Sequence, residues 1–393
     1  MSEVKVNKIS PRSGTDVTLG DSEDTFTIPS GATIANYGTA TGFAAGNRNL
    51  IINGAMQIAQ RSTSVQKQYD SGSGYYTLDR VRLAMGNLDQ AVFTLSQGSH
   101  LLTGPEGFPN SWKIVTDTAE TALASDEYLS FQYNIEANSC QQLAYGTSSA
   151  KETTISFWVK SDVTGTYSIM LYAADAGRNI GGTYTIDSAD TWEYKTVTFV
   201  GDTGGTGINN DTGLGVQIVW ALTAGTDRTS ADNTSWGTFA TNRNAYGQAV
   251  NVLASATDYW QVTGLQFEIG SVATPFEYKT YGQELAACQR YYQKLYSGQE
   301  GPLGTYLDSP TLYTYFYPLM VEMRSAPTLD QGSSSPSFEY RYSGWQTDGT
   351  FSSLGAQTMA IRFRLSQPSA VDTYGIAIAI ETKGTWSVDA ELA

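Results

Sequence analysis

The chain has 393 residues, a length that suits two or three domains and is ample for a buried core. Charged residues make up 16% of it, against about 25% in a typical soluble protein, and 39 glycines and 25 tyrosines favour β-structure with many turns. The formal net charge of −15 and the lack of a Lys/Arg cluster argue against nucleic-acid binding. No run of about 18 apolar residues is present that would insert into a membrane.

Signals for export and for enzymatic chemistry are sparse. The first residues, MSEVKVNKIS, lack an apolar stretch, so we expect no classical signal peptide. Cys140 and Cys288 are far apart, and two free buried thiols in a protein folded in a reducing cytoplasm are expected rather than a disulfide. The single histidine, His100, lies in the loop-like SQGSHLLTG with no nucleophile motif beside it. We therefore expect no catalytic residues and no enzyme.

Residues 1–47 contain short alternating pieces separated by glycines. Each piece offers one or two apolar side chains, too few to form a core, and a lone hairpin of this kind is marginal in water. The segment is either a disordered leader or a strand shaft that buries its apolar residues against copies of itself, and we favour the shaft. The shaft interpretation predicts an attachment stalk that becomes ordered only in an oligomer.

Residues 48–281 carry repeated strand signals separated by turn residues. Four stretches alternate so that their apolar residues share one face: Ile155, Phe157 and Val159; Tyr167, Ile169 and Leu171; Val197 and Phe199; and Val216, Ile218, Trp220 and Leu222. The parity changes at Gly264, which predicts a β-bulge. Many half-apolar strands at hairpin spacing indicate an antiparallel sandwich or jelly roll.

The last part of the chain begins with the one clear helical pattern. Over 282–296, Leu285, Cys288, Tyr292 and Leu295 form an apolar stripe. Residues 297–393 return to strand patterns and predict a smaller β domain. The predicted fold is all-β, with shaft strands in 1–47, a jelly-roll sandwich in 48–281, and a linking helix followed by a β tip domain in 282–393.

Several stretches, in this order along the chain, resemble phage tail-fibre proteins, especially those of marine phages: NKISPRSGTDVTLGDSEDTFTIPSGATIANYGTATGF, NLIINGAMQIAQR, YYTLDRVRL, TISFWVKSDVTGTYSIML, VTGLQFEIGSVATPFEYKTYGQELAACQRYYQK and MRSAPTL. The resemblance covers most of residues 4–330, and long matches in series are more specific than one short motif. Where family members usually read Asp-Arg-Trp, this chain has Asp79, Arg80 and Val81.

The resemblance implies a virion protein of the phage tail, assembled in the cytoplasm of the host bacterium. Residues 1–47 would join other tail proteins, the sandwich would be similar to carbohydrate-binding modules, and the chain would be a homotrimer. The implied function is recognition of the host-cell surface by non-covalent, multivalent binding to a glycan or an outer-membrane protein. A tail-associated glycan depolymerase and a purely structural adaptor or capsid fibre remain as alternatives.

Sugar recognition commonly uses exposed aromatic faces, because pyranose C–H groups pack on them while amides and carboxylates meet the hydroxyls. Trp158 has the parity of the outer face of its strand, and the alternative is that a neighbouring chain or loop covers it. The long polar segment 223–248 holds Trp236, Arg243 and Tyr246, which contact either a ligand or the adjacent subunit. Trp220 has core parity and is expected to be structural.

A third group of candidates lies in the predicted tip. TLYTYFYPL places Tyr313, Tyr315 and Tyr317 on one strand face, and FEYRYSGW adds Tyr340, Tyr342 and Trp345. Tyrosine is common at recognition surfaces, and a trimer interface explains the same pattern equally well. No cofactor is expected. A structural Ca²⁺ in an Asp-rich loop of the sandwich is left open, although no loop has the EF-hand spacing of oxygen ligands.

Overall fold

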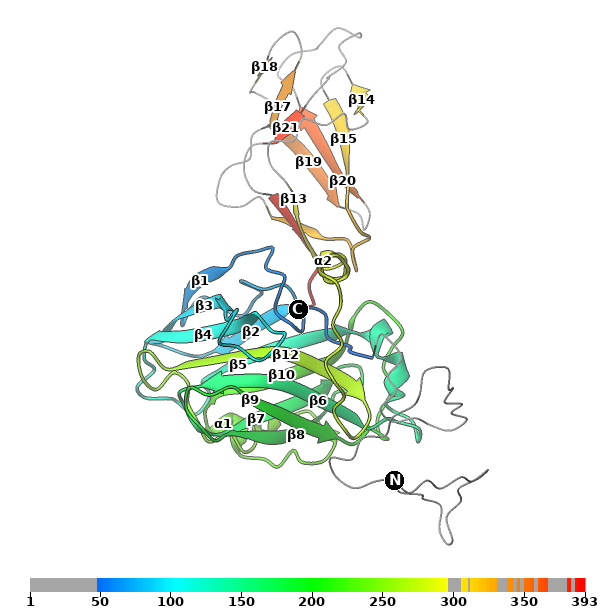
Figure 1. Ribbon diagram of the computed structural model, residues 1–393. Coiled ribbons are helices and arrows are strands. Elements are labelled where there is room, and N and C mark those ends of the chain that lie inside the picture. The colour runs from blue at the N-terminus through cyan, green and yellow to red at the C-terminus, as the bar shows by residue number, and fades with distance from the viewer. Residues whose placement is uncertain are drawn as a thin grey trace, which may run out of the picture. The chain divides into compact units, whose positions relative to one another are not determined.

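The computed structural model of the chain describes residues 48–295, 305–309, 312–330, 338–341, 345–346, 350–356, 360–366, 380–382 and 386–392 (Figure 1). Side chains are described in 48–294, 319–328 and 387–392. Two units, Met1–Phe43 and Ala44–Ala393, divide the chain, and every described residue belongs to the second. The predicted shaft, residues 1–47, lies outside the described residues, and the predicted division into three parts, with boundaries at 47/48 and 281/282, remains a prediction.

Two six-stranded antiparallel sheets form a sandwich (Figure 1). Sheet A has the order β1 (Ser64–Gln68), β3 (Val92–Ser99), β4 (Asn110–Thr118), β12 (Tyr259–Ile269), β6 (Thr153–Ser161) and β9 (Glu193–Phe199). Sheet B has the order β11 (Gly237–Thr238), β8 (Arg178–Ile186), β7 (Gly165–Ala173), β10 (Leu214–Ala224), β5 (Tyr128–Glu136) and β2 (Val81–Gly86). The prediction of an all-β jelly-roll sandwich is confirmed.

The hydrophobic core lies between the sheets and follows the predicted alternation. In β6, Ile155, Phe157 and Val159 are fully buried, and in β10 Trp220 is buried as its parity predicts. The Trp220 ring meets Phe131 of β5 at a centroid distance of 5.1 Å in an edge-on arrangement. Burying side chains of this size contributes roughly 1.5–3 kcal/mol each, so this aromatic core is a main source of the sandwich's stability.

A bulge interrupts β12 where the sequence predicts one. The register of β12 against β6 shifts between Thr263 and Gln266. Gly264 has a φ of 62°, a backbone conformation that favours glycine. The bulge lets both halves of β12 turn their apolar residues toward the core, which explains the change of parity.

The linking helix is shorter than predicted. Helix α2 spans Tyr281–Gln289, whereas the apolar stripe predicted a helix over 282–296. The next segment, Tyr292–Leu295, is strand β13 and pairs antiparallel with β22 (Trp386–Asp389). The prediction was wrong for this segment because pairing with a strand about ninety residues away replaces the helical hydrogen bonds, and local periodicity does not report such pairing. Cys288 of the stripe is buried as expected.

The rest of the described chain consists of short strands and helical turns. β13 belongs to a three-stranded sheet with β22 and β16 (Thr328–Asp330); a four-stranded sheet contains β14 (Thr305–Ser309), β15 (Leu312–Pro318), β20 (Ala360–Ser366) and β19 (Thr350–Ala356); and a further sheet contains β18 (Trp345–Gln346), β17 (Phe338–Arg341) and β21 (Ile380–Thr382). Short helices within the sandwich are η1 (Ala137–Leu143), α1 (Thr226–Thr229) and η2 (Thr241–Arg243). Among the described residues no helix reaches the length and hydropathy of a membrane span.

The C-terminal residues return to the sandwich through a buried ion pair. Arg80 is 1% exposed, its guanidinium contacts the Glu391 carboxylate, and it donates to the Asn134 carbonyl oxygen at 2.5 Å. The guanidinium also lies 3.5 Å from the centroid of the Tyr291 ring. Burial acts to lower the pKa of Arg80, but the Glu391 charge outweighs it, and the pKa is raised well above its usual value. This pair holds the C-terminal end against β2 and β5.

Asp79, beside this ion pair, gives a prediction for the pH dependence of stability. Its carboxylate is fully buried and accepts a hydrogen bond from the Gln60 backbone N–H at 2.9 Å. Burial raises the pKa of Asp79 to about 6, above the unfolded value of about 3.9. The folded chain therefore binds more protons than the unfolded chain in this interval, and the free energy of unfolding should fall as pH rises from about 4 to about 6.

The Asp79→Asn variant isolates this contribution, because its amide does not titrate. Urea denaturation at several pH values in that interval should give a smaller fall in stability for the variant than for the wild type. If the free energy of unfolding falls equally with pH in the wild type and the variant, Asp79 does not have the raised pKa in the folded protein.

Candidate functional site

A groove of about 390 Å³ lies on the outer face of sheet B. Strands β2, β5, β10 and β7 form its floor, because side chains alternate across a strand and those opposite to the core face outward. The chain segment after β10 forms part of its wall. The lining includes Arg82, Tyr128, Ser130, Gln132, Met170, Tyr172, Gln217, Val219, Arg228, Phe239 and Asn244.

A row of amide side chains crosses the floor of the groove from β2 to β10. Arg82 donates from Nη1 to Gln132 Oε1 at 2.5 Å. Gln217 donates from Nε2 to Gln132 Oε1 at 3.3 Å and to Asn134 Oδ1 at 2.9 Å. Each side chain is held by its neighbour on the next strand, so the row presents donors and acceptors in fixed positions. Such an arrangement is suited to a ligand with several hydroxyl groups.

Aromatic rings supply the apolar part of the groove. Tyr172 of β7 and Phe239 of the wall have ring centroids 4.8 Å apart with an interplanar angle of 53°, and Phe239 is 38% exposed. Tyr128, the first residue of β5, lies under the Arg228 guanidinium at 3.6 Å from its ring centroid. A ring-shaped ligand can pack its C–H groups on these faces while the amide row meets its polar groups.

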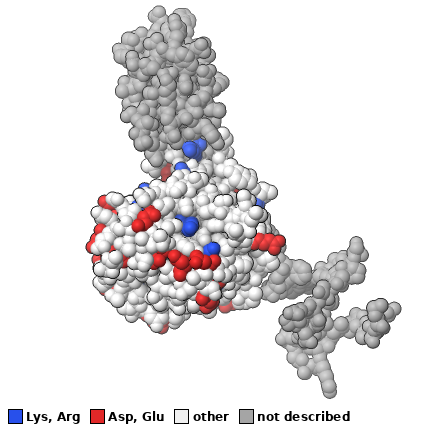
Figure 2. Space-filling view, turned by 60° about the vertical axis from the view of Figure 1, so that its left-hand side comes forward, with Lys and Arg blue, Asp and Glu red and all other residues white. Residues whose placement is uncertain are grey.

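The charge of the groove is opposite to that of the chain. Its lining contains Arg82 and Arg228 but no Asp or Glu, although the net charge of the protein is −15. Figure 2 shows that acidic side chains predominate on one face of the sandwich. Within the described residues, neither arginine forms an ion pair with a carboxylate. The groove is a local positive site in an acidic protein.

Two polar atoms at this wall lack hydrogen-bond partners. Arg228 Nε and Asn244 Oδ1 are buried and unpaired in the described structure. Burial lowers the pKa of Arg228, and the nearby Tyr128, Asp126 and Asp227 offset part of that effect. Buried polar atoms are usually paired, so a donor and an acceptor left unpaired at a groove indicate room for a polar ligand or ordered water.

Trp158 lies on the outer face of sheet A, on the opposite side of the sandwich from the groove. It is half-buried, and its ring lies 5.2 Å from the ring of Tyr194 on β9. The predicted parity is therefore correct. Its proposed contact with a ligand, and the alternative of a covering chain or loop, remain predictions.

Two of the candidates in 223–248, Trp236 and Arg243, use their polar atoms within the fold. The Trp236 indole donates from Nε1 to the Val200 carbonyl oxygen at 2.7 Å and packs edge-on against the Tyr145 ring. Arg243 donates to two carbonyl oxygens of its own loop, those of Asp232 at 2.5 Å and Ser235 at 2.8 Å. Neither side chain lines the groove, nor does the exposed Tyr246.

The same segment lines the groove with residues that sequence reasoning missed, namely Arg228, Phe239 and Asn244. Arg82, Gln132 and Gln217 were missed as well. The only signal for Arg82, Gln132 and Gln217 in the sequence is their outward parity on a strand. Every other solvent-facing residue on the strands of the sandwich has the same parity. Their functional grouping depends on which strands are neighbours.

Tyr313, Tyr315 and Tyr317 lie on β15, Tyr340 lies on β17 and Trp345 on β18. The side chains of these residues, and Tyr342 entirely, lie outside the described residues. Their role in binding or in a trimer interface stays a prediction.

His100 has a serine neighbour but not the surroundings of a catalytic base. Its Nε2 lies 2.8 Å from Ser111 Oγ, and its ring meets Trp192 edge-on. Burial, followed by the charges of Lys160 and Lys113, lowers the pKa of His100. Ser111 is fully buried, and among the described hydrogen bonds none joins a carboxylate to the His100 ring. Because a buried serine is not accessible to a substrate, we interpret the contact between His100 and Ser111 as structural.

The two cysteines are free and buried, as predicted. Burial raises the pKa of the Cys140 thiol to about 12 and that of Cys288 well above its usual value. Both thiols are therefore protonated and inert at neutral pH.

No protein-family model and no curated protein matches the sequence. Among solved structures, the enzymatically active domain of tailspike protein 4 from bacteriophage CBA120 aligns over 56% of this chain with 10% identity and a TM-score of 0.31, and the alignment covers 21% of that chain. TmCBM61 in complex with β-1,4-galactotriose aligns over 57% of this chain and 100% of its own length, with 9% identity and a TM-score of 0.26.

The family 11 carbohydrate-binding module from Clostridium thermocellum, in complex with a mixed-linked tetrasaccharide, aligns over 56% of this chain and 99% of its own length. Its identity is 12% and its TM-score is 0.26. Likenesses at this level assign no function to this chain, and its function has to be inferred from its own residues.

Proposed function

We propose that this protein is the receptor-binding component of a phage tail fibre, and that it attaches without cleavage to a glycan on the host surface through the sheet B groove. The observation that carries the proposal is the composition of the groove: a fixed amide row, aromatic faces and two arginines that form no ion pair with a carboxylate in the described part of the chain. The tail role rests on the sequence resemblance. The groove supports the glycan part.

The two arginines favour an acidic saccharide, one that carries carboxylate or sulfate groups. A guanidinium presents a planar fork of donors that matches the two oxygens of a carboxylate. Arg82 uses Nη1 to hold Gln132, so the rest of its fork faces no described acceptor. No Asp or Glu lines the groove, so no carboxylate repels such a ligand from within the lining.

The test is binding of the full-length protein to an immobilised panel of neutral and acidic oligosaccharides. The Gln217→Trp variant places a large side chain in the lining of the groove and should abolish binding. The matched control Thr196→Trp places the same side chain on an exposed position of β9, on the other sheet, and should bind like the wild type. Equal binding by both variants would remove the groove from the proposal. Release of shorter products from the panel would favour the depolymerase instead.

Trimerisation through residues 1–47 is a separate part of the proposal. Three weak sites on one particle give avidity far above that of a single site. Sedimentation of the full chain should give a trimer, because the apolar residues of 1–47 are too few to form a core within one copy. A variant that lacks residues 1–47 should sediment as a monomer. A monomeric full chain would contradict the shaft interpretation.

A further inference from the structure

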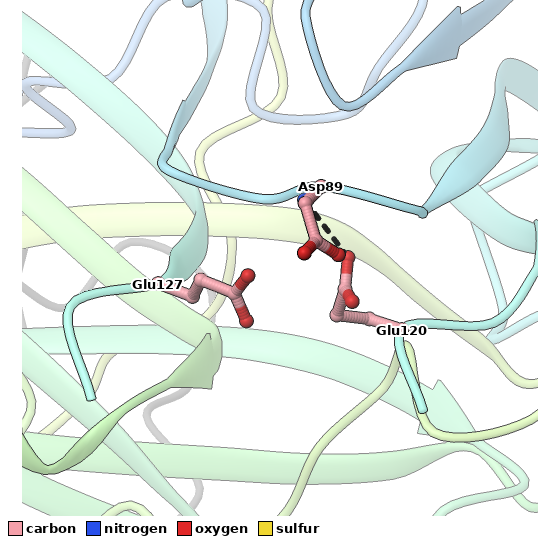
Figure 3. A group of neighbouring side chains, drawn as sticks. All are labelled: Asp89, Glu120 and Glu127. Carbon is pink, nitrogen blue, oxygen red and sulfur yellow. Dashed lines mark hydrogen bonds between the residues drawn. The ribbon is translucent and has the colours of Figure 1, made fainter. Parts of the chain in front are cut away.

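Three carboxylates meet at one end of the sandwich, away from any ion pair in the described structure. Asp89 lies in the turn between β2 and β3, Glu120 follows β4, and Glu127 directly precedes β5. Their ligand oxygens all lie within 4.8 Å of one another (Figure 3). The close-up shows the three side chains pointing toward a common centre from two different connections.

Glu120 has a buried carboxylate that is satisfied on one side only. Its side chain is 1% exposed, and its Oε2 accepts hydrogen bonds from the backbone N–H groups of Asp89, Gln90 and Ala91 at 3.3, 3.0 and 3.1 Å. Its Oε1 is buried and has no hydrogen-bond partner. A buried carboxylate oxygen without a donor is costly, so this atom requires a further positive or protic partner.

Glu127 adds a second buried carboxylate beside Glu120 and so increases the need for a positive partner. It is 2% exposed, and its Oε2 accepts from the Ala124 backbone N–H at 2.7 Å. No Lys or Arg forms an ion pair with any of the three carboxylates in the described part of the chain. Like charges this close repel strongly in a buried environment unless a cation lies between them.

We propose that Asp89, Glu120 and Glu127 bind a Ca²⁺ ion. The donors are all carboxylate oxygens, which suit a hard cation rather than a transition metal. Ca²⁺ accepts six to eight oxygens in irregular geometry, whereas Mg²⁺ demands a near-ideal octahedron. Asp89 is exposed, so water can complete the coordination shell on its side, while Glu120 Oε1 supplies the inner ligand.

Such an ion would join two connections that each cross between the sheets, β2 to β3 and β4 to β5. Asp89 and Glu120 stand at the ends of strands β3 and β4 of sheet A, whereas Glu127 leads into β5 of sheet B. The carbonyl oxygen of Glu127 also accepts from Gly225 N–H at 2.8 Å, beside helix α1. The ion is therefore expected to stabilise the folded sandwich, whatever ligand the groove binds.

Isothermal titration of CaCl₂ into the full-length protein, after removal of divalent ions with EDTA, tests the proposal. We expect binding with a stoichiometry of one ion per chain, and a rise in Tm of several degrees at about a hundredfold excess over Kd. The Glu120→Gln variant should lose both the heat and the Tm shift. The matched control Asp126→Asn changes an exposed carboxylate of the same loop that is not part of the cluster, and it should keep both.

The Glu127→Gln variant separates a cation site from an unfavourable acidic cluster. In EDTA it should melt above the wild type, because one of the repelling charges is gone. In Ca²⁺ it should melt below the wild type, because a ligand is gone. The assignment is overturned if the wild type shows neither heat nor Tm shift, if the shift persists in both glutamine variants, or if Mg²⁺ at the same concentration gives an equal shift.

Discussion

Replacing Glu391 by alanine is expected to lower the free energy of unfolding by about 3–5 kcal/mol, the range for removing one partner of a buried ion pair. Arg80 is 1% exposed, and Glu391 is the only carboxylate that forms an ion pair with it among the described residues. Without Glu391 the guanidinium would remain charged in a dry site, with the Tyr291 and Tyr133 rings and the Asn134 carbonyl oxygen among its remaining contacts. Urea denaturation of the full chain followed by tryptophan fluorescence measures the loss.

The control for this prediction is an ion pair at the surface. Asp187 has a side chain that is 69% exposed and lies 3.0 Å from Lys195 Nζ. Asp187→Ala should change the free energy of unfolding by no more than about 1 kcal/mol, because solvent screens such pairs. Similar small losses for both variants would show that Arg80 is solvated and the C-terminal end is not anchored as described.

This anchoring also limits how a binding site can be mapped. Deleting residues 284–393 would remove a candidate tip, but it would also remove Glu391 and leave Arg80 unpaired in the sandwich. A loss of binding after that deletion could then reflect a destabilised sandwich. Point substitutions in the groove avoid this ambiguity.

Replacing Arg82 by alanine is expected to weaken binding of an acidic oligosaccharide by roughly tenfold to a hundredfold, since hydrogen bonds to charged groups contribute about 1.5–3 kcal/mol. Affinity for the neutral analogue should change much less, because the neutral sugar forms no charge-assisted bond with the guanidinium. Rising salt should weaken the wild type more than the variant. Titration of both oligosaccharides into the full-length protein measures these differences.

Two control variants make the outcome specific. Arg82→Lys keeps the charge but not the fork, and it should bind with intermediate affinity. Lys160→Ala removes one positive charge from the outer face of sheet A, so it matches the change in net charge without touching the groove. If Arg82→Ala binds the acidic and neutral sugars as the wild type does, Arg82 plays no part in recognition. If only the preference for the acidic sugar is absent, the groove still binds glycans but selects on another basis.

The residues that line the groove differ from the aromatic residues that the sequence predicts as ligand-binding. Trp236, predicted from the sequence as a ligand-binding aromatic, packs against Tyr145 and donates its indole N–H to the Val200 carbonyl oxygen. The groove instead depends on glutamines, arginines, two tyrosines and a phenylalanine whose side chains are ordinary for outward positions of strands and loops. The Trp158 side chain points outward as predicted, but it lies on sheet A, whereas the groove lies on sheet B.

The sequence by itself determined the all-β fold class, the core faces of β6, β7 and β10, the bulge at Gly264 and the two free thiols. It did so because a strand turns successive side chains to opposite faces, so alternation along a few residues reports burial directly. The tertiary structure decided which strands are neighbours, where α2 ends and which outward residues share a groove. Arg80 and Glu391 are 311 residues apart, and no local pattern reports a contact across that separation. Pairing over such distances is selected by the packing of the whole sandwich, which only the folded chain reveals.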